Sequence, residues 1–167
     1  MLVREGTWKK WLLINTHNRD VETPLYIASK HDHLKTVKVL TSRKECNFDI
    51  LDGQGTTPLH IACMLDHHSI IEFLVADQRC PLNAINRKGK TPLHVTFECG
   101  YLDVIKVLAS KENCCLNVAD REGNTPLHSA CKHGHHSTVE LLVADQRWNT
   151  QNNEMNTPLH IACYSNH

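Results

Sequence analysis

Histidine and cysteine are the residues of this sequence whose side chains could carry out chemistry. The chain has thirteen histidines and eight cysteines among 167 residues. They gather in short stretches such as His31-Asp32-His33 and Cys131-Lys132-His133-Gly134-His135. Imidazole and thiolate groups two residues apart can share a zinc ion, and a cysteine beside a histidine can act as an activated nucleophile. A zinc site and a cysteine nucleophile are therefore the first hypotheses to weigh.

The spacing of the histidines favours a different interpretation. Four of them end the tetrapeptide Thr-Pro-Leu-His, and an altered copy of it ends in Tyr26. The threonines that begin these copies are Thr23, Thr57, Thr91, Thr125 and Thr157, at successive distances of 34, 34, 34 and 32 residues. Such a period is typical of stacked structural repeats. Only His17 falls outside the repeated positions, so we interpret the histidines as parts of the repeat and expect no metal site and no cofactor.

The cysteines follow the same period. Cys46, Cys80 and Cys114 are each 34 residues apart, and no Cys-x-x-Cys pair occurs. Members of such a set lie in different repeats, and helices pack about 8–10 Å apart. This is too far for a disulfide, which needs Cα atoms closer than about 7 Å. The sequence therefore predicts reduced thiols and a cytoplasmic, possibly nuclear, location. Because no Cys–His pair stands out and a stack of repeats offers no deep pocket, we predict no catalytic residue and no enzyme activity.

Each tetrapeptide has the residues that start a helix. Threonine is a good N-cap, proline is favoured at the first helical position, and the following leucine begins a buried stripe. Each first helix should end at a left-handed residue, filled by Asp32, Asp66, Gly100 and Gly134 in turn. A second helix follows, with apolar residues three and four positions apart. Since no helix pair could bury its apolar face alone, the units must stack on one another.

The pattern Asp-x-x-Gly-x-Thr-Pro-Leu-His-x-Ala, followed by a break and a second helix, resembles the ankyrin repeat. The resemblance covers about Asn18 to His167. It implies an all-α repeat solenoid of ankyrin-type helix–turn–helix units joined by β-hairpin-like loops. We place repeats at residues 18–51, 52–85, 86–119 and 120–151, a partial repeat at 152–167, and the tail of a preceding repeat or an N-terminal cap at 1–17.

Some positions depart from the family pattern. Val21 and Met155 stand where the loop glycine is expected. A β-branched valine is strained at positive φ, which predicts an irregular first loop. The chain stops before the second helix of its last unit, so we expect Leu159 and Ile161 to be poorly covered and the chain to be a piece of a longer protein.

The resemblance also assigns roles to single polar residues. It implies that the motif histidine bonds to its own threonine and to the backbone of the adjoining repeat, while Tyr26 departs from this pattern. Asn15, Asn83 and Asn117 resemble an asparagine that an oxygenase hydroxylates in some family members. Their ordinary role, hydrogen bonding to the loop backbone, is the interpretation that we prefer.

The charge and hydropathy of the chain restrict its partners. The 18 Lys and Arg residues balance the 18 Asp and Glu residues, so no bulk charge favours nucleic acid or an anionic membrane. No run approaches the roughly 18 apolar residues that span a bilayer. We therefore expect no nucleic acid, no membrane insertion and no small-molecule substrate.

The resemblance implies other proteins as partners. The chain would be a scaffold or adaptor that binds partner proteins through its hairpin tips and its concave inner-helix face. Alternatively, it would be the recruiting or regulatory arm of a larger enzyme or signalling protein whose effector domain lies outside this segment. The candidate partner-binding residues vary between repeats while their neighbours repeat. They are Arg19, Glu22, Gln54, Thr56, Met64, Leu65, Arg87, Lys88, Lys90, Glu98, Arg121, Glu122, Asn124, Lys132, His133 and Tyr164.

Overall fold

The computed structural model describes residues 13–143 and 150–165 of the chain. In these two ranges every regular element is a helix, and no strand occurs. The helices are α2 (Pro24–Lys30), α3 (Leu34–Thr41), α4 (Pro58–Met64), α5 (His68–Val75), α6 (Pro92–Cys99), α7 (Leu102–Ala109), α8 (Pro126–His133), α9 (His136–Val143) and α10 (Pro158–Tyr164). The predicted all-α repeat solenoid is confirmed, and the loops between the units are turns.

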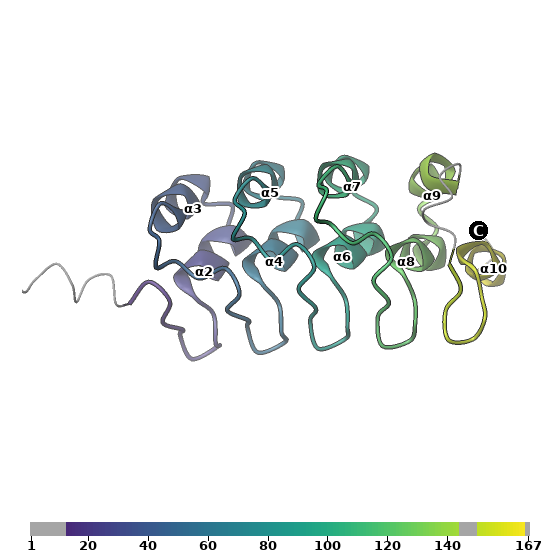
Figure 1. Ribbon diagram of the computed structural model, residues 1–167, viewed down its shortest axis with the longest axis horizontal. Coiled ribbons are helices and arrows are strands. Elements are labelled where there is room, and N and C mark those ends of the chain that lie inside the picture. Colours follow the sequence, from purple (N-terminus) through teal and green to yellow (C-terminus); the bar gives the residue numbers. More distant parts are fainter. Residues whose placement is uncertain (1–12, 144–149, 166–167) are drawn as a thin grey trace, which may run out of the picture.

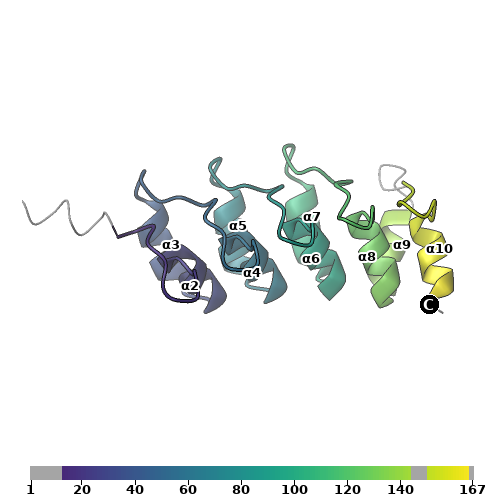
Figure 2. The same ribbon diagram turned by 90° about the horizontal axis from the view of Figure 1, so that it is seen from below.

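The helices form two parallel rows with the loops projecting from one side (Figure 1). The inner row consists of α2, α4, α6, α8 and α10, and the outer row of α3, α5, α7 and α9. Figure 2 shows the same units side by side, with the loops extending away from the helix pairs. Successive inner helices contact one another, and α2, α4, α6 and α8 each pack on the outer helix of their own unit. A corner runs along the stack, with loops on one side and inner helices on the other.

The expected start and stop signals are present in the inner helices. The Oγ1 atom of Thr57 accepts the backbone N–H of His60 at 3.3 Å, and proline occupies the first turn. At the far ends, Gly100 and Gly134 have φ values of 75° and 72° and cap α6 and α8 in the left-handed conformation. Asp32 and Asp66 take the same conformation, as their positions in the sequence predicted.

The prediction of an irregular first loop is wrong. Val21 and Met155 both adopt the left-handed conformation, with φ values of 63° and 62°. The first loop is nevertheless closed by N–H donation from Asn18 to the carbonyl oxygen of Glu22 (3.0 Å) and from Val21 to that of Asn18 (3.1 Å). The same two bonds close each later loop. The Asn18 side chain accepts two more backbone N–H groups of this loop, so hydrogen bonding outweighs the local strain.

Stacking buries the leucine of each motif except the last. Leu59, Leu93 and Leu127 are between 1% and 3% exposed because the next inner helix covers them, whereas Leu159 is 63% exposed. The poor cover predicted for Leu159 is confirmed, and Ile161 is partly buried. The side chain of Phe97, in the first helix of the third unit, is fully buried.

The motif histidines join neighbouring units. The backbone N–H of Thr57 donates to Nδ1 of His60 at 3.2 Å, so the ring proton is on Nε2, which donates to the carbonyl oxygen of Lys90 in the next loop at 2.9 Å. His94 and His128 make the equivalent bonds to the loops that follow them. Burial lowers the pKa of His60 to about 4, which keeps the ring neutral. The role that the family resemblance implied for this histidine is confirmed.

Other polar side chains join the units in similar ways. The hydroxyl of Tyr26 donates to Oδ2 of Asp52 in the following loop at 2.9 Å, so the altered first motif also reaches its neighbour. Burial and this hydrogen bond raise the pKa of Tyr26. The Asn15 and Asn83 side chains each bond to loop backbone one unit further along. Their predicted structural role is confirmed.

Candidate functional site

The buried thiols are poor nucleophiles. All eight cysteines are free. Burial raises the pKa of the Cys63 thiol to about 12 and that of Cys131 to about 11. Because the thiolate is the nucleophile, these environments suppress thiol chemistry. In the two described ranges no three His, Cys, Asp or Glu side chains are grouped so that they could hold a metal ion.

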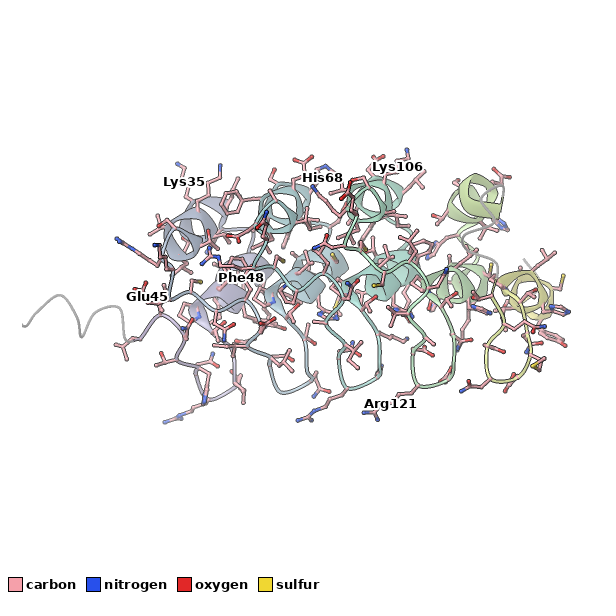
Figure 3. All side chains as sticks on the ribbon, in the orientation of Figure 1. Lys35, Glu45, Phe48, His68, Lys106 and Arg121 are labelled. Atoms are coloured by element: carbon pink, nitrogen blue, oxygen red, sulfur yellow. The ribbon has the colours of Figure 1, made fainter. Side chains whose placement is uncertain are left out.

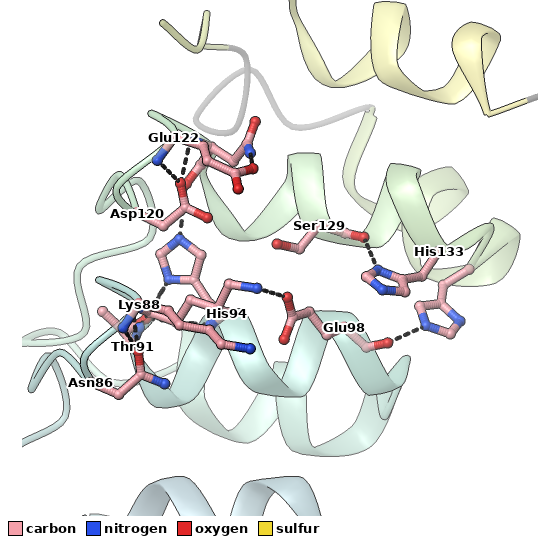
Figure 4. Close-up of polar contacts among 12 residues, drawn as sticks. Asn86, Lys88, Thr91, His94, Glu98, Asp120, Glu122, Ser129 and His133 are labelled. Atoms are coloured by element: carbon pink, nitrogen blue, oxygen red, sulfur yellow. Dashed lines mark hydrogen bonds and ion pairs between the residues drawn. The ribbon is translucent and has the colours of Figure 1, made fainter. Parts of the chain in front are cut away.

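A hollow of about 590 Å³ lies in the corner between the loops and α6, α8 and α10. We call it the concave hollow. Figure 4 shows Glu98 on α6 facing Ser129 and His133 on α8, with Asp120 and Glu122 on the loop that leads into α8. The predicted partner-binding residues that line it are Lys88, Lys90, Glu98, Glu122, Asn124, Lys132, His133 and Tyr164.

Other predicted residues lie elsewhere on the same side of the stack. Arg87 and Arg121 line a second, shallower hollow of about 350 Å³ between the third and fourth loop tips. Arg19 and Gln54 are exposed on the first two loops. Met64 and Leu65 are each 43% exposed at the end of α4.

Thr56 was predicted to lie at an exposed loop tip, and this prediction is wrong. The residue is only 7% exposed. Its backbone N–H donates to Oδ1 of Asp52 at 2.7 Å, and its carbonyl oxygen accepts the N–H of Asp52 at 3.0 Å. These bonds hold it at the base of the loop, beside the buried N-cap Thr57, instead of at the exposed tip.

An ion pair crosses the corner of the third unit. Lys90 on the loop pairs with Glu98 on α6, eight residues later. The first unit has the same pair with its charges exchanged, since Lys30 donates to Glu22 at 2.7 Å. The Lys30 ammonium holds the pKa of Glu22 below its usual value. These paired residues therefore hold the first and third loops against their inner helices as well as facing the corner.

The pair is absent from the second unit, where Thr56 and Met64 occupy the two positions, and from the fourth unit. Asn124 replaces the charged loop residue, and its Nδ2 donates to Oε2 of Glu122 at 3.0 Å. Lys132, at the helix position, makes no ion pair with any described residue. Lys88 on the third loop is likewise without an acidic partner there. The concave hollow thus holds paired and unpaired cations side by side.

Several residues of the concave hollow were missed from the sequence. They include Asp120, Ser129, Asn152 and Ile161. Asp120 shows why: its Oδ1 accepts the backbone N–H groups of Glu122 and Asn124, both at 2.9 Å, as the repeat requires. A search for positions that vary between repeats does not find residues such as Asp120, because they are repeated for their role in the loop although they also line the surface. No signal in the sequence distinguishes the two roles.

Comparison with known proteins agrees with the observed architecture. A family model described as ankyrin repeats (three copies) matches residues 6–83, 42–120, 68–152 and 112–167. No curated protein matches the chain significantly. Among the described residues no helix is long and apolar enough to cross a membrane.

Proposed function

Because this chain belongs to the ankyrin-repeat family, whose repeats are generally protein–protein interaction modules, we propose that it is a scaffold or adaptor. A partner protein would bind along the loop tips and the inner helices, with the concave hollow as the centre of the contact. We propose no catalytic activity for these residues, in keeping with the typically non-enzymatic role of such repeats.

The observation that carries this proposal is the contrast between rigid and variable positions. Caps and motif histidines are buried and bonded in the same way in successive units. The residues between them differ from unit to unit and reach solvent, including Met64, Lys132 and Tyr164. A rigid frame with variable exposed side chains lowers the entropy cost of binding and leaves specificity to those side chains. Exposed apolar groups such as Tyr164, which is 75% exposed, commonly anchor interfaces.

A capture experiment with matched variants tests the face. The face variant carries Met64→Ser, Lys132→Glu and Tyr164→Ser, and the control carries Lys35→Ala and Lys106→Ala on the outer helices (Figure 3). Circular dichroism and urea unfolding establish that both variants are folded. We expect proteins captured from cell extract by the native chain to be retained by the control and lost by the face variant. Capture of the same proteins by all three chains would show that this face is not the binding surface.

A further inference from the structure

We propose that this chain associates with a second copy of itself, head to tail. The end face of α10 in one copy binds the α2 end of the next. Figure 1 shows α2 and α10 at opposite ends of the inner row. The inference goes beyond the proposed function, because it concerns the two ends of the stack and not its concave side.

The surface at the α10 end, which we call the tail face, is the exposed copy of a surface that is covered in the other units. Leu159 is 63% exposed, whereas its counterparts in α4, α6 and α8 lie under the next inner helix. Cys163 is also exposed, although the equivalent Cys63 and Cys131 are buried. No lysine, arginine, aspartate or glutamate is among the five residues of this face, so a second molecule meets an apolar surface without a charge to neutralise. They line a hollow of about 270 Å³ and are Thr157, Leu159, His160, Cys163 and Tyr164.

His160 carries the donor half of a hydrogen bond that joins the other units. Its Nδ1 accepts the backbone N–H of Thr157 at 3.2 Å, as in the earlier motifs. The same arrangement leaves Nε2–H of His60, His94 and His128 to donate to a carbonyl oxygen of the next loop. Nε2 of His160 has no such acceptor in the described part of the chain. An occupant of the tail face should therefore offer a backbone carbonyl oxygen beside an apolar helix.

The α2 end of the chain has that carbonyl oxygen. The residue before the motif threonine accepts two N–H groups in the later loops, one from its own loop and one from the histidine of the preceding unit. Glu22 occupies this position in the first loop, and among the described residues its carbonyl oxygen accepts only the N–H of Asn18, at 3.0 Å. Because a carbonyl oxygen has two lone pairs, a second bond can form there. His160 of one copy and Glu22 of the next thus hold the two halves of the bond that joins neighbouring units.

The packing surface at the α2 end is also incompletely covered. The proline that begins each inner helix is buried in α4, α6, α8 and α10, which all follow another unit, but Pro24 of α2 is only half-buried. Ile27 is half-buried as well, while the equivalent residues of α4, α6 and α8 are buried. We call Glu22, Pro24 and Ile27 the head face. The tail face of a second copy has the apolar surface that would cover it.

Met155, on the last loop, does not prevent this packing. Gly55 and Gly89 have the equivalent position, and a Cβ added there would meet the backbone of the following loop at 2.9 and 2.8 Å. A larger residue must therefore hold two successive loops further apart. The first loop has Val21 at this position, yet α2 and α4 still pack on one another. The junction between two copies should resemble this first junction, in which the inner helices pack.

Sedimentation velocity over a wide range of protein concentration tests the inference, in the presence of a reducing agent so that no disulfide links the copies. The tail variant carries Leu159→Glu, which changes a side chain that is already exposed. The head variant carries Pro24→Glu, which places a carboxylate in the first turn of a helix, where it is favoured. The matched control is Val39→Glu on α3, because Val39 is 58% exposed and belongs to neither face. Urea unfolding establishes that each variant is folded.

We expect the native chain and the control to increase in mass as the concentration rises, because every head-to-tail assembly retains one free head and one free tail. The tail and head variants should each need a concentration at least about tenfold higher to associate, since each would bury a carboxylate against an apolar surface. A mixture of these two variants should form dimers and nothing larger, because one retains a free head and the other a free tail.

Three results would overturn the inference. The native chain could remain monomeric at every concentration. Its association could be unaffected by both variants, which would place the contact elsewhere. Finally, the tail variant could be monomeric while the head variant associates as the native chain does, which would show that two tail faces bind each other. The capture experiment on the concave side is independent of all three results.

Discussion

Acidification should destabilise this protein through the buried ring of His60. The ring is fully buried and neutral: Nδ1 accepts the backbone N–H of Thr57, and Nε2–H donates to the carbonyl oxygen of Lys90 in the next unit. Adding a proton to Nδ1 would remove the first bond and place a charge between two units. For this reason burial lowers the pKa of His60 from 6.5 to about 4.

The direction and size of the effect follow from this shift. A histidine whose folded-state pKa is depressed binds fewer protons when folded than when unfolded. Its contribution to stability is therefore complete above pH 6.5 and is lost as the pH falls toward 4. The full shift corresponds to roughly 3 kcal/mol, of which roughly 2 kcal/mol would be lost at about pH 5. His94 and His128 have pKa values lowered by burial as well, so they act in the same direction.

Urea unfolding at about pH 7.5 and about pH 5 measures the effect, with His60→Gln as the test variant. Glutamine can still donate its side-chain N–H toward Lys90 but does not titrate. We expect this variant to be less stable at the higher pH, and to lose roughly 2 kcal/mol less than the native chain on acidification. His17→Gln, at an exposed position, should lose as much as the native chain. Equal losses in the native chain and in His60→Gln would refute the argument that burial keeps this ring neutral.

Five further substitutions, two of them controls, test packing and loop geometry by thermal or urea unfolding. Leu93→Ala should cost about 2–5 kcal/mol as a truncation in the core, and Lys88→Ala should change stability by less than about 0.5 kcal/mol; equal losses would contradict the assignment of core and surface. Gly89→Ala should destabilise the protein by more than about 1 kcal/mol, because Gly89 has a φ of +78° and an added Cβ would lie 2.8 Å from the backbone of the next loop. Gly53→Ala is the control: an added Cβ there meets no atom within 4 Å, so this substitution should be nearly neutral. Tyr26→Phe should cost about 1 kcal/mol through loss of its hydrogen bond to the second loop, and an unchanged unfolding midpoint would show that this bond contributes nothing.

Much of the fold could be predicted from the sequence because its signals are local. Thr57 and His60 are three residues apart, so their capping bonds depend on one turn of helix. Asp66 and Gly100 could be assigned to left-handed positions by their place between two helical patterns. The first loop is an instructive failure: the intrinsic preference of Val21 predicted distortion, but the bonds donated and accepted by Asn18 hold the regular turn.

The binding face was less predictable. Positions that vary between repeats included Lys88, Lys132 and Tyr164, which do line the concave hollow. The same criterion admitted Thr56, which is buried, because variation between repeats does not report exposure. Contact of these residues with a partner is the prediction that the capture experiment tests.

The sequence by itself determined the repeat, the start and stop signals of its inner helices and the repeated positions of most histidines and cysteines, because these follow from spacing and short-range bonding. Only the tertiary structure decided which charges are paired. Lys90 and Lys88 look alike as neighbours in one loop, yet Lys90 reaches Glu98 on α6 while Lys88 has no such partner among the described residues. That difference arises where a loop packs against its helix, and it determines which side chains remain free to meet another molecule.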